Sequence, residues 1–151
     1  MKLILQKNIP SQEAMKVFAK SIFEDFLREQ PNFAFFLEGA LGAGKTFFIR
    51  EVLRHFGVER EVGSPTYIFL NEYKAGGKDF AHFDFYRLPH PDEFFARGFN
   101  EIAEHGGTSA FIEWPDKISR EAHKTFSGKK FLLRIDHGTG VGMRTVKLLE
   151  V

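Results

Sequence analysis

The stretch from Phe33 to Thr46, FAFFLEGALGAGKT, constrains this chain more than any other. It begins with an apolar run that predicts a buried strand, and it ends in a glycine-rich turn closed by Lys45 and Thr46. Together with Gly39 and Gly44, these two residues fit the phosphate-loop pattern G-x-x-x-x-G-K-[ST]. Glycines in such a loop let successive backbone N–H groups turn inward around a polyphosphate. The stretch therefore predicts a nucleotide-binding loop.

A helix is predicted directly after the loop, over Thr46 to Phe56. Its N-terminus would point free N–H donors and the positive end of its dipole at the same phosphates. The order strand, loop and helix is the context that this motif needs. The predicted nucleotide-binding residues of the loop are Gly39, Ala40, Leu41, Gly42, Ala43, Gly44, Lys45 and Thr46.

Length and composition indicate one folded domain. A chain of 151 residues can bury one core but leaves no room for a second independent domain. Its 43% hydrophobic and 27% charged residues are ordinary for a globular protein. The 19 phenylalanines predict a Phe-rich core, with the alternative that some rings lie exposed as partner anchors.

Several classes of site and location are disfavoured by what the sequence contains. Without cysteine there are no disulfides, zinc-thiolate sites or cysteine nucleophiles. No apolar run has the length of a membrane span and the first ten residues do not read as a signal peptide, so we expect a cytoplasmic protein without a membrane partner. The net charge of +1 gives no reason to expect direct binding of nucleic acid. Six acidic residues between positions 91 and 116 indicate either a solvated face or a docking face for a partner.

The order of the predicted elements indicates an α/β fold. A strand at Lys2 to Gln6, a helix from Ser11 to about Gln30 and the strand of the phosphate loop alternate as in parallel sheets. Tyr67 to Tyr73 and Asp79 to Phe85 read as an antiparallel hairpin, so the sheet is expected to be mixed.

The second half of the chain continues this alternation. A helical stretch follows Asp92, a short strand over Ser109 to Ile112 delivers Glu113 at its end, and two strands are predicted over Phe131 to Asp136 and Arg144 to Leu149. We therefore predict one three-layer α/β domain of the P-loop NTPase type over residues 1–151, with a mixed, mainly parallel sheet and helices on both faces.

The residue types near the loop suit phosphate and metal chemistry. Lys45 can reach the β- and γ-phosphates, and the Thr46 hydroxyl can ligate Mg²⁺; both side chains are expected to face solvent in the free protein. A second metal ligand would come from Asp84 or Glu113, although each carboxylate could equally be a solvated strand end or an ion-pair partner. Thr66 is either a switch residue that senses phosphate and metal or an ordinary turn residue.

Histidines are a weaker signal than the carboxylates. The six histidines lack the spacing of a metal site, and His82 is expected to pack or hydrogen-bond beside Asp84.

Four ordered motifs give the chain a family resemblance. LGAGKT at Leu41 to Thr46, SPTY at Ser64 to Tyr67, HFDFYRL at His82 to Leu88 and IEW at Ile112 to Trp114 resemble the TsaE (YjeE) family. That family comprises bacterial P-loop ATPases required for threonylcarbamoyladenosine modification of tRNA. The resemblance extends over about residues 9 to 136, which is far more specific than a phosphate loop alone.

The resemblance implies roles for particular residues. It implies that Thr46 and Glu113 hold Mg²⁺ and that Asp84 is needed for hydrolysis. Lys45 and Thr66 are predicted as further catalytic residues. The resemblance also implies that Ser11 and Gln12 contribute to an adenine site. Two residues depart from the family pattern: Ala40 stands where the family usually has Asp, and Ala14 stands near a position often occupied by Thr.

The resemblance further implies a function and partners. The chain would bind Mg-ATP and hydrolyse it slowly, with the TsaD–TsaB pair, for modification of adenosine 37 in tRNAs that read codons beginning with adenine. Contact with tRNA would be only indirect. The alternatives are a small-molecule kinase of the P-loop class and a nucleotide-controlled interaction module that does not hydrolyse. Preference for ATP over GTP rests on the resemblance and on the absence of an N-K-x-D motif.

Overall fold

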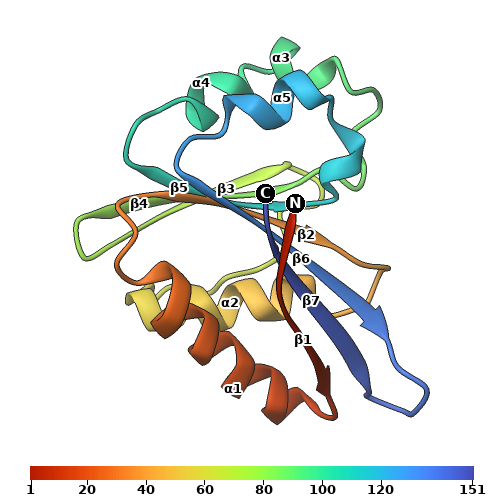
Figure 1. Ribbon diagram of the computed structural model, residues 1–151. Helices are drawn as coiled ribbons and strands as arrows, with labels where there is room; N and C mark the ends of the chain where they lie inside the picture. The colour runs from red at the N-terminus through yellow and green to blue at the C-terminus, as the bar shows by residue number, and fades with distance from the viewer.

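The computed structural model describes the whole chain, residues 1–151, around a seven-stranded sheet (Figure 1). The strands are β1 (Lys2–Ile9), β2 (Phe33–Glu38), β3 (Leu70–Ala75), β4 (Lys78–Asp84), β5 (Thr108–Glu113), β6 (Lys129–His137) and β7 (Arg144–Glu150). Their order across the sheet is β1-β7-β6-β2-β5-β4-β3. Only β3 and β7 run against the direction of the other strands, so the predicted mixed, mainly parallel sheet is confirmed.

Helices cover both faces of this sheet, which gives the three layers that the sequence predicts (Figure 1). One face carries α1 (Gln12–Ile22), which continues into a π-helical turn (Phe23–Leu27), and α2 (Lys45–Phe56). The other carries α3 (Glu93–Ala96), α4 (Phe99–Ala103) and α5 (Arg120–Thr125), with a 3₁₀ turn at Pro115–Lys117. None of the helices combines the length and the apolar composition that crossing a membrane requires.

The central strand β2 divides the core into two halves. Successive side chains of a strand point to opposite faces, so Phe35 packs toward α2 and stacks on Phe48 at 5.4 Å between ring centroids. Phe36 points the other way and meets Phe126 edge to face at 5.7 Å. Ten of the nineteen phenylalanines are fully buried in these two halves, which confirms the Phe-rich core.

Two segments near the site are shorter than the sequence pattern suggests. The strand expected from Tyr67 begins only at Leu70, because the N–H of Phe69 bonds the Pro65 carbonyl and Phe69 has a φ of 66°. That turn keeps residues 65–69 out of the sheet. The helical stretch after Asp92 is divided by Gly98, whose φ of 75° ends one short helix and begins the next.

Helix α5 is the element that the sequence pattern did not predict. It lasts only six residues and is capped at its N-terminus by Ser119, whose hydroxyl accepts from the Ala122 N–H at 3.1 Å. So short a segment does not contain enough helical turns to show the apolar repeat by which a helix is recognised in a sequence. Its position is set by packing of Ala122 and Phe126 against the sheet.

The carboxyl edge of the parallel strands brings three functional segments into line. The phosphate loop leaves the end of β2, Glu113 ends β5 and Asp84 ends β4. In the strand register Glu113 pairs with Leu37 on one side and with Asp84 on the other. Ligands of open α/β sheets bind outside this edge.

Candidate functional site

The phosphate loop has the backbone that its glycines predict. Gly42 and Gly44 have φ values of 77° and 110°, which L-residues with side chains seldom adopt. A Cβ on Gly39 would lie 2.7 Å from the Ile135 carbonyl oxygen, so only glycine fits where the loop leaves β2. The first N–H groups of a helix have no partner within it, and at the start of α2 no side chain caps them either, so they are free to bind a ligand.

Lys45 is not solvent-facing, so that expectation is wrong. The residue is 5% exposed, and its ammonium donates to the carbonyls of Gly39 at 2.5 Å and Ala40 at 3.0 Å. It also lies 4.5 Å from the centre of the Trp114 ring. The curled loop and the indole together cover a side chain that would otherwise extend into water. Lys45 is thus held at the loop by three different contacts.

Charge and burial act in opposite directions on this lysine. Burial lowers the pKa of Lys45 below its ordinary value, while the negative charges of Glu113, Asp84 and Asp116 oppose that shift. The carboxylates therefore favour the charged ammonium at the place where phosphate charge would also favour it.

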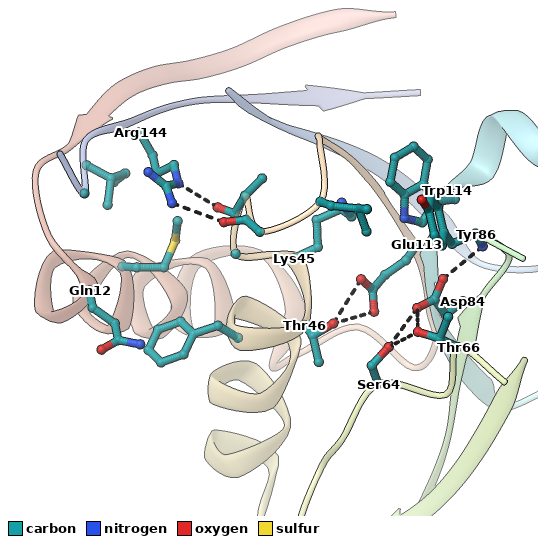
Figure 2. A pocket seen from close by; sticks show the side chains of 18 of the residues that line it. Gln12, Lys45, Thr46, Ser64, Thr66, Asp84, Tyr86, Glu113, Trp114 and Arg144 are labelled. Atoms are coloured by element: carbon teal, nitrogen blue, oxygen red, sulfur yellow. Dashed lines mark hydrogen bonds between the residues drawn. The ribbon is translucent and has the colours of Figure 1, made fainter. Parts of the chain in front are cut away.

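Thr46 and Glu113 form the second part of the site (Figure 2). The Thr46 hydroxyl lies 3.0 Å from each of the two carboxylate oxygens of Glu113. Glu113 is 3% exposed and also contacts His82, whose Nε2 lies 2.6 Å from Oε2. His82 is thus packed in the core and bonded to Glu113, the register neighbour of Asp84, which agrees with the expectation that it packs or hydrogen-bonds beside Asp84.

Asp84 organises the loop that precedes β3. Its Oδ2 accepts from the Ser64 hydroxyl at 2.8 Å and from the Thr66 hydroxyl at 2.7 Å, and its Oδ1 accepts from the Tyr86 N–H at 3.0 Å. Figure 2 shows this carboxylate beside that of Glu113. Thr66 is therefore tied to the site through Asp84 rather than exposed as a free turn residue.

One cavity of about 690 Å³ joins these groups. Its lining includes the following predicted site residues: Ser11, Gln12, Leu41, Gly42, Ala43, Gly44, Lys45, Thr46, Thr66, Asp84 and Glu113. Gly39 and Ala40 do not line it, and contact Lys45 through their carbonyls instead.

Arg144 is a lining residue that sequence reasoning missed. It begins β7, and its guanidinium donates to the carbonyls of Ala43 at 3.0 Å, Gly42 at 3.1 Å and Met143 at 2.9 Å. No local pattern marks this arginine, because its two partners in the phosphate loop lie about a hundred positions earlier in the chain.

Trp114, Tyr86, Arg87 and Tyr67 also line the cavity, and these four lie inside motifs that the sequence analysis quotes. Trp114 has a φ of 58°, which turns the chain sharply after Glu113 and brings the indole over Lys45. Arg87 lies 4.8 Å from the centre of the Tyr67 ring. Their motif membership was the signal that could have identified them.

The donor set suits a small hard cation bound together with phosphate. The chain has no group of three or more His, Cys, Asp or Glu side chains that could hold a metal by themselves. A hydroxyl and a carboxylate do lie together, at Thr46 and Glu113. Mg²⁺ is commonly bound by one or two protein oxygens while phosphates and water complete its shell. The residues therefore fit the metal that the motif implies.

The fold and the site define an α/β domain of the P-loop NTPase type. Comparison with known proteins gives the family: the model described as "Threonylcarbamoyl adenosine biosynthesis protein TsaE" matches residues 9–143. The chain belongs to the TsaE family.

Individual relatives agree with this assignment. A Rickettsia felis protein named tRNA threonylcarbamoyladenosine biosynthesis protein TsaE is 38% identical over 117 residues, covering 77% of this chain and 63% of its own length. A Haemophilus influenzae protein of the same name is 38% identical, covering 75% of this chain and 72% of its own length. The match thus leaves more than a third of the Rickettsia felis protein unaligned.

A solved structure supports the fold. The crystal structure of YdiB from Bacillus subtilis superposes with a TM-score of 0.71 at 24% identity, covering 100% of this chain and 88% of that one. At this identity the likeness concerns the fold.

Proposed function

We propose that this protein binds Mg-ATP and hydrolyses it slowly, as the ATPase of threonylcarbamoyladenosine formation in tRNA. The observation that carries the proposal is the meeting of Lys45, Thr46, Asp84 and Glu113 around one cavity at the carboxyl edge of the sheet. The names of the relatives support the pathway. Adenosine 37 of tRNAs reading codons that begin with adenine is the proposed target, reached only through partners.

The phosphate loop is proposed to bind the triphosphate. Lys45 would exchange the carbonyls of Gly39 and Ala40 for β- and γ-phosphate oxygens, which are stronger partners for an ammonium. Thr46 and Glu113 would hold Mg²⁺, which supplies charge neutralisation to the phosphates when bound. Ser11 and Gln12, at the other end of the cavity, would contact the adenine.

Asp84 is proposed to act on hydrolysis by positioning a loop. Both of its oxygens already accept hydrogen bonds from Ser64, Thr66 and Tyr86. A carboxylate so engaged is better suited to hold Thr66 beside the phosphates than to take a proton from water. Thr66 would then orient the attacking water, which is a positioning role common in P-loop enzymes.

Partner dependence is proposed because the arginines of the cavity are engaged elsewhere. Arg144 donates to loop carbonyls and Arg87 lies against Tyr67. An arginine that reaches the transferred phosphoryl group contributes roughly 10³ to 10⁵ in rate. We propose that the TsaD–TsaB pair supplies this charge or orders the loop that carries Thr66.

The test is phosphate release from Mg-ATP by the protein alone and with TsaD–TsaB. At least a tenfold increase is expected with the pair, about 1.4 kcal/mol of barrier. Lys45→Ala and Thr46→Ala should abolish release in both conditions with an unchanged circular dichroism spectrum. An ordinary enzyme rate without partners would contradict partner dependence. Unchanged release by Lys45→Ala would contradict the site.

A further inference from the structure

A buried histidine lies directly beneath the site and does not line its cavity. His82 is 0% exposed, near the end of β4, and its Nε2 is 2.6 Å from Oε2 of Glu113. Its other nitrogen, Nδ1, is buried and has no hydrogen-bond partner. A buried polar atom without a partner is costly, so His82 at this position lowers the stability of the fold.

The contact with Glu113 selects the tautomer of His82. A carboxylate oxygen only accepts, so the short contact requires a hydrogen on Nε2. With this hydrogen on Nε2, the buried Nδ1 is left as an acceptor without a donor. In the opposite neutral tautomer, the lone pair of Nε2 would point at a lone pair of the Glu113 carboxylate, and the two would repel each other. The geometry therefore favours the tautomer protonated at Nε2.

The bond from His82 distinguishes the two carboxylate oxygens of Glu113, whereas the contact with Thr46 does not. The Thr46 hydroxyl lies 3.0 Å from both oxygens of Glu113, yet it has only one hydrogen to donate. Thr46 alone therefore does not decide how the carboxylate is rotated. His82 contacts only Oε2, and it approaches from the buried side. Its hydrogen bond therefore restrains the rotation of the carboxylate from that side.

We infer that His82 is a positioning residue for Glu113, holding this carboxylate in the orientation that ligates the metal. The inference rests on the proposed role of Glu113 toward Mg²⁺. Hydrogen-bonding partners behind metal ligands typically contribute 10- to 100-fold in metal affinity. The alternative is that His82 only fills space in the core.

Substitutions at His82 distinguish the positioning role from the space-filling role, because the new side chains differ in whether they can donate a hydrogen bond to Glu113. His82→Gln places an amide N–H near the position of Nε2 and should preserve the bond to Glu113. His82→Phe keeps the ring volume and removes the donor. His82→Asn keeps an amide that is too short to reach Glu113, so it replaces the Phe variant if that variant does not fold.

The first measurement needs neither nucleotide nor metal. Long-range ¹H–¹⁵N spectra of protein labelled with ¹⁵N-histidine should show His82 protonated at Nε2, and the signal should change in Glu113→Ala. A spectrum with the hydrogen on Nδ1 and none on Nε2 would overturn the inference whatever the function of the protein.

The second measurement is the Mg²⁺ dependence of ADP binding by calorimetry. His82→Phe should raise the Mg²⁺ concentration for half-maximal binding about tenfold, with ADP binding in EDTA unchanged, and His82→Gln should stay within about threefold of the wild type. In a Glu113→Gln background, His82→Phe should add nothing. His123→Phe is the matched control, because His123 bonds the Pro115 carbonyl rather than a carboxylate and should leave the Mg²⁺ dependence unchanged.

The outcomes distinguish this inference from the proposed function. If the wild type depends on Mg²⁺ and His82→Phe behaves identically, the inference fails and the function stands. If Gln and Phe variants lose Mg²⁺ affinity equally, His82 acts through packing and the inference also fails. If ADP binding by the wild type is insensitive to Mg²⁺, the proposed role of Glu113 toward the metal is wrong, and the inference about His82 fails as well.

Discussion

Replacement of Arg144 by alanine should weaken nucleotide binding about tenfold, although this arginine lies outside every predicted motif. Its guanidinium holds the carbonyls of Gly42 and Ala43. The C=O and N–H of one trans peptide point in opposite directions, so fixing the Ala43 carbonyl also fixes the N–H of Gly44 on the other side of the loop. Arg144 thereby orders the donors that a phosphate needs before the ligand arrives.

The magnitude follows from the two loop contacts. A hydrogen bond from a charged donor contributes about 1.5–3 kcal/mol. Arg144 is only half-buried, and water takes over part of each bond when the side chain is removed. We therefore expect a net loss of about 1.4 kcal/mol of binding free energy, which is a factor of ten in Kd. Arg144→Lys keeps the charge without the fork of donors and should recover only part of it.

Calorimetry of ADP binding measures this loss, and Arg134→Ala is its matched control. Arg134 is also a half-buried strand arginine, but it pairs with Glu38 at 2.8 Å and does not line the cavity. Arg134→Ala should bind ADP like the wild type. The reasoning is refuted if Arg144→Ala binds within twofold of the wild type, or if both variants lose the same affinity.

Three further results are expected. Glu113→Gln should raise the Mg²⁺ concentration needed for ADP binding, because an amide is a poorer ligand for a hard cation. Asp84→Asn should leave ADP binding unchanged and lower the rate of phosphate release. Titrations that show the reverse would exchange the roles of the two carboxylates. Gly39→Ala should lower the free energy of unfolding by roughly 1–3 kcal/mol, since its Cβ would meet the Ile135 carbonyl at 2.7 Å, and a denaturant midpoint equal to the wild type would contradict this. The pKa of Lys45 is lowered on folding, so between that pKa and 10.5 the unfolded chain binds more protons than the folded one. The free energy of unfolding should therefore rise with pH in this alkaline window. The rise should be smaller in Lys45→Met, and equal slopes in the two proteins would show that Lys45 is not the cause.

The sequence predicts the parts of the site that follow one another in the chain. The loop from Gly39 to Thr46 carries its own backbone signal, and Asp84 and Glu113 each follow an apolar strand, so their place at one edge of a parallel sheet follows from the fold class. The residues alone did not decide whether Glu113 or Asp84 pairs with Thr46, and only the family resemblance favoured Glu113. That pairing depends on strand order, which places β5 next to β2 and β4 one strand further away.

Charge counting along the chain also has a limit that the structure explains. The acidic run of residues 91–116 appears as one feature in the sequence, but not all of its members lie on the surface. Glu101 and Glu104 are exposed, while Glu113 is buried in the site. Glu113 therefore belongs to the chemistry of the cavity, and the count of charges that could form a docking face is smaller than the sequence suggests.

The missed arginine points to a role for the antiparallel part of the sheet. Strands β6, β7 and β1 extend the sheet beyond β2, and their pairing sets Arg144 opposite both His137 and Ile9. The end of β1 carries the chain into Ser11, so Ile9, Ser11 and Arg144 all reach the cavity from this side. The parallel strands supply Glu113 and Asp84 from the other side. The phosphate loop thus lies between two parts of the mixed sheet. The parallel strands supply the carboxylates on one side, and Arg144 of β7 holds the carbonyls of the loop on the other. If the antiparallel extension serves this purpose, shortening the β6–β7 turn should weaken ADP binding as Arg144→Ala does, and the two changes together should cost no more than either alone.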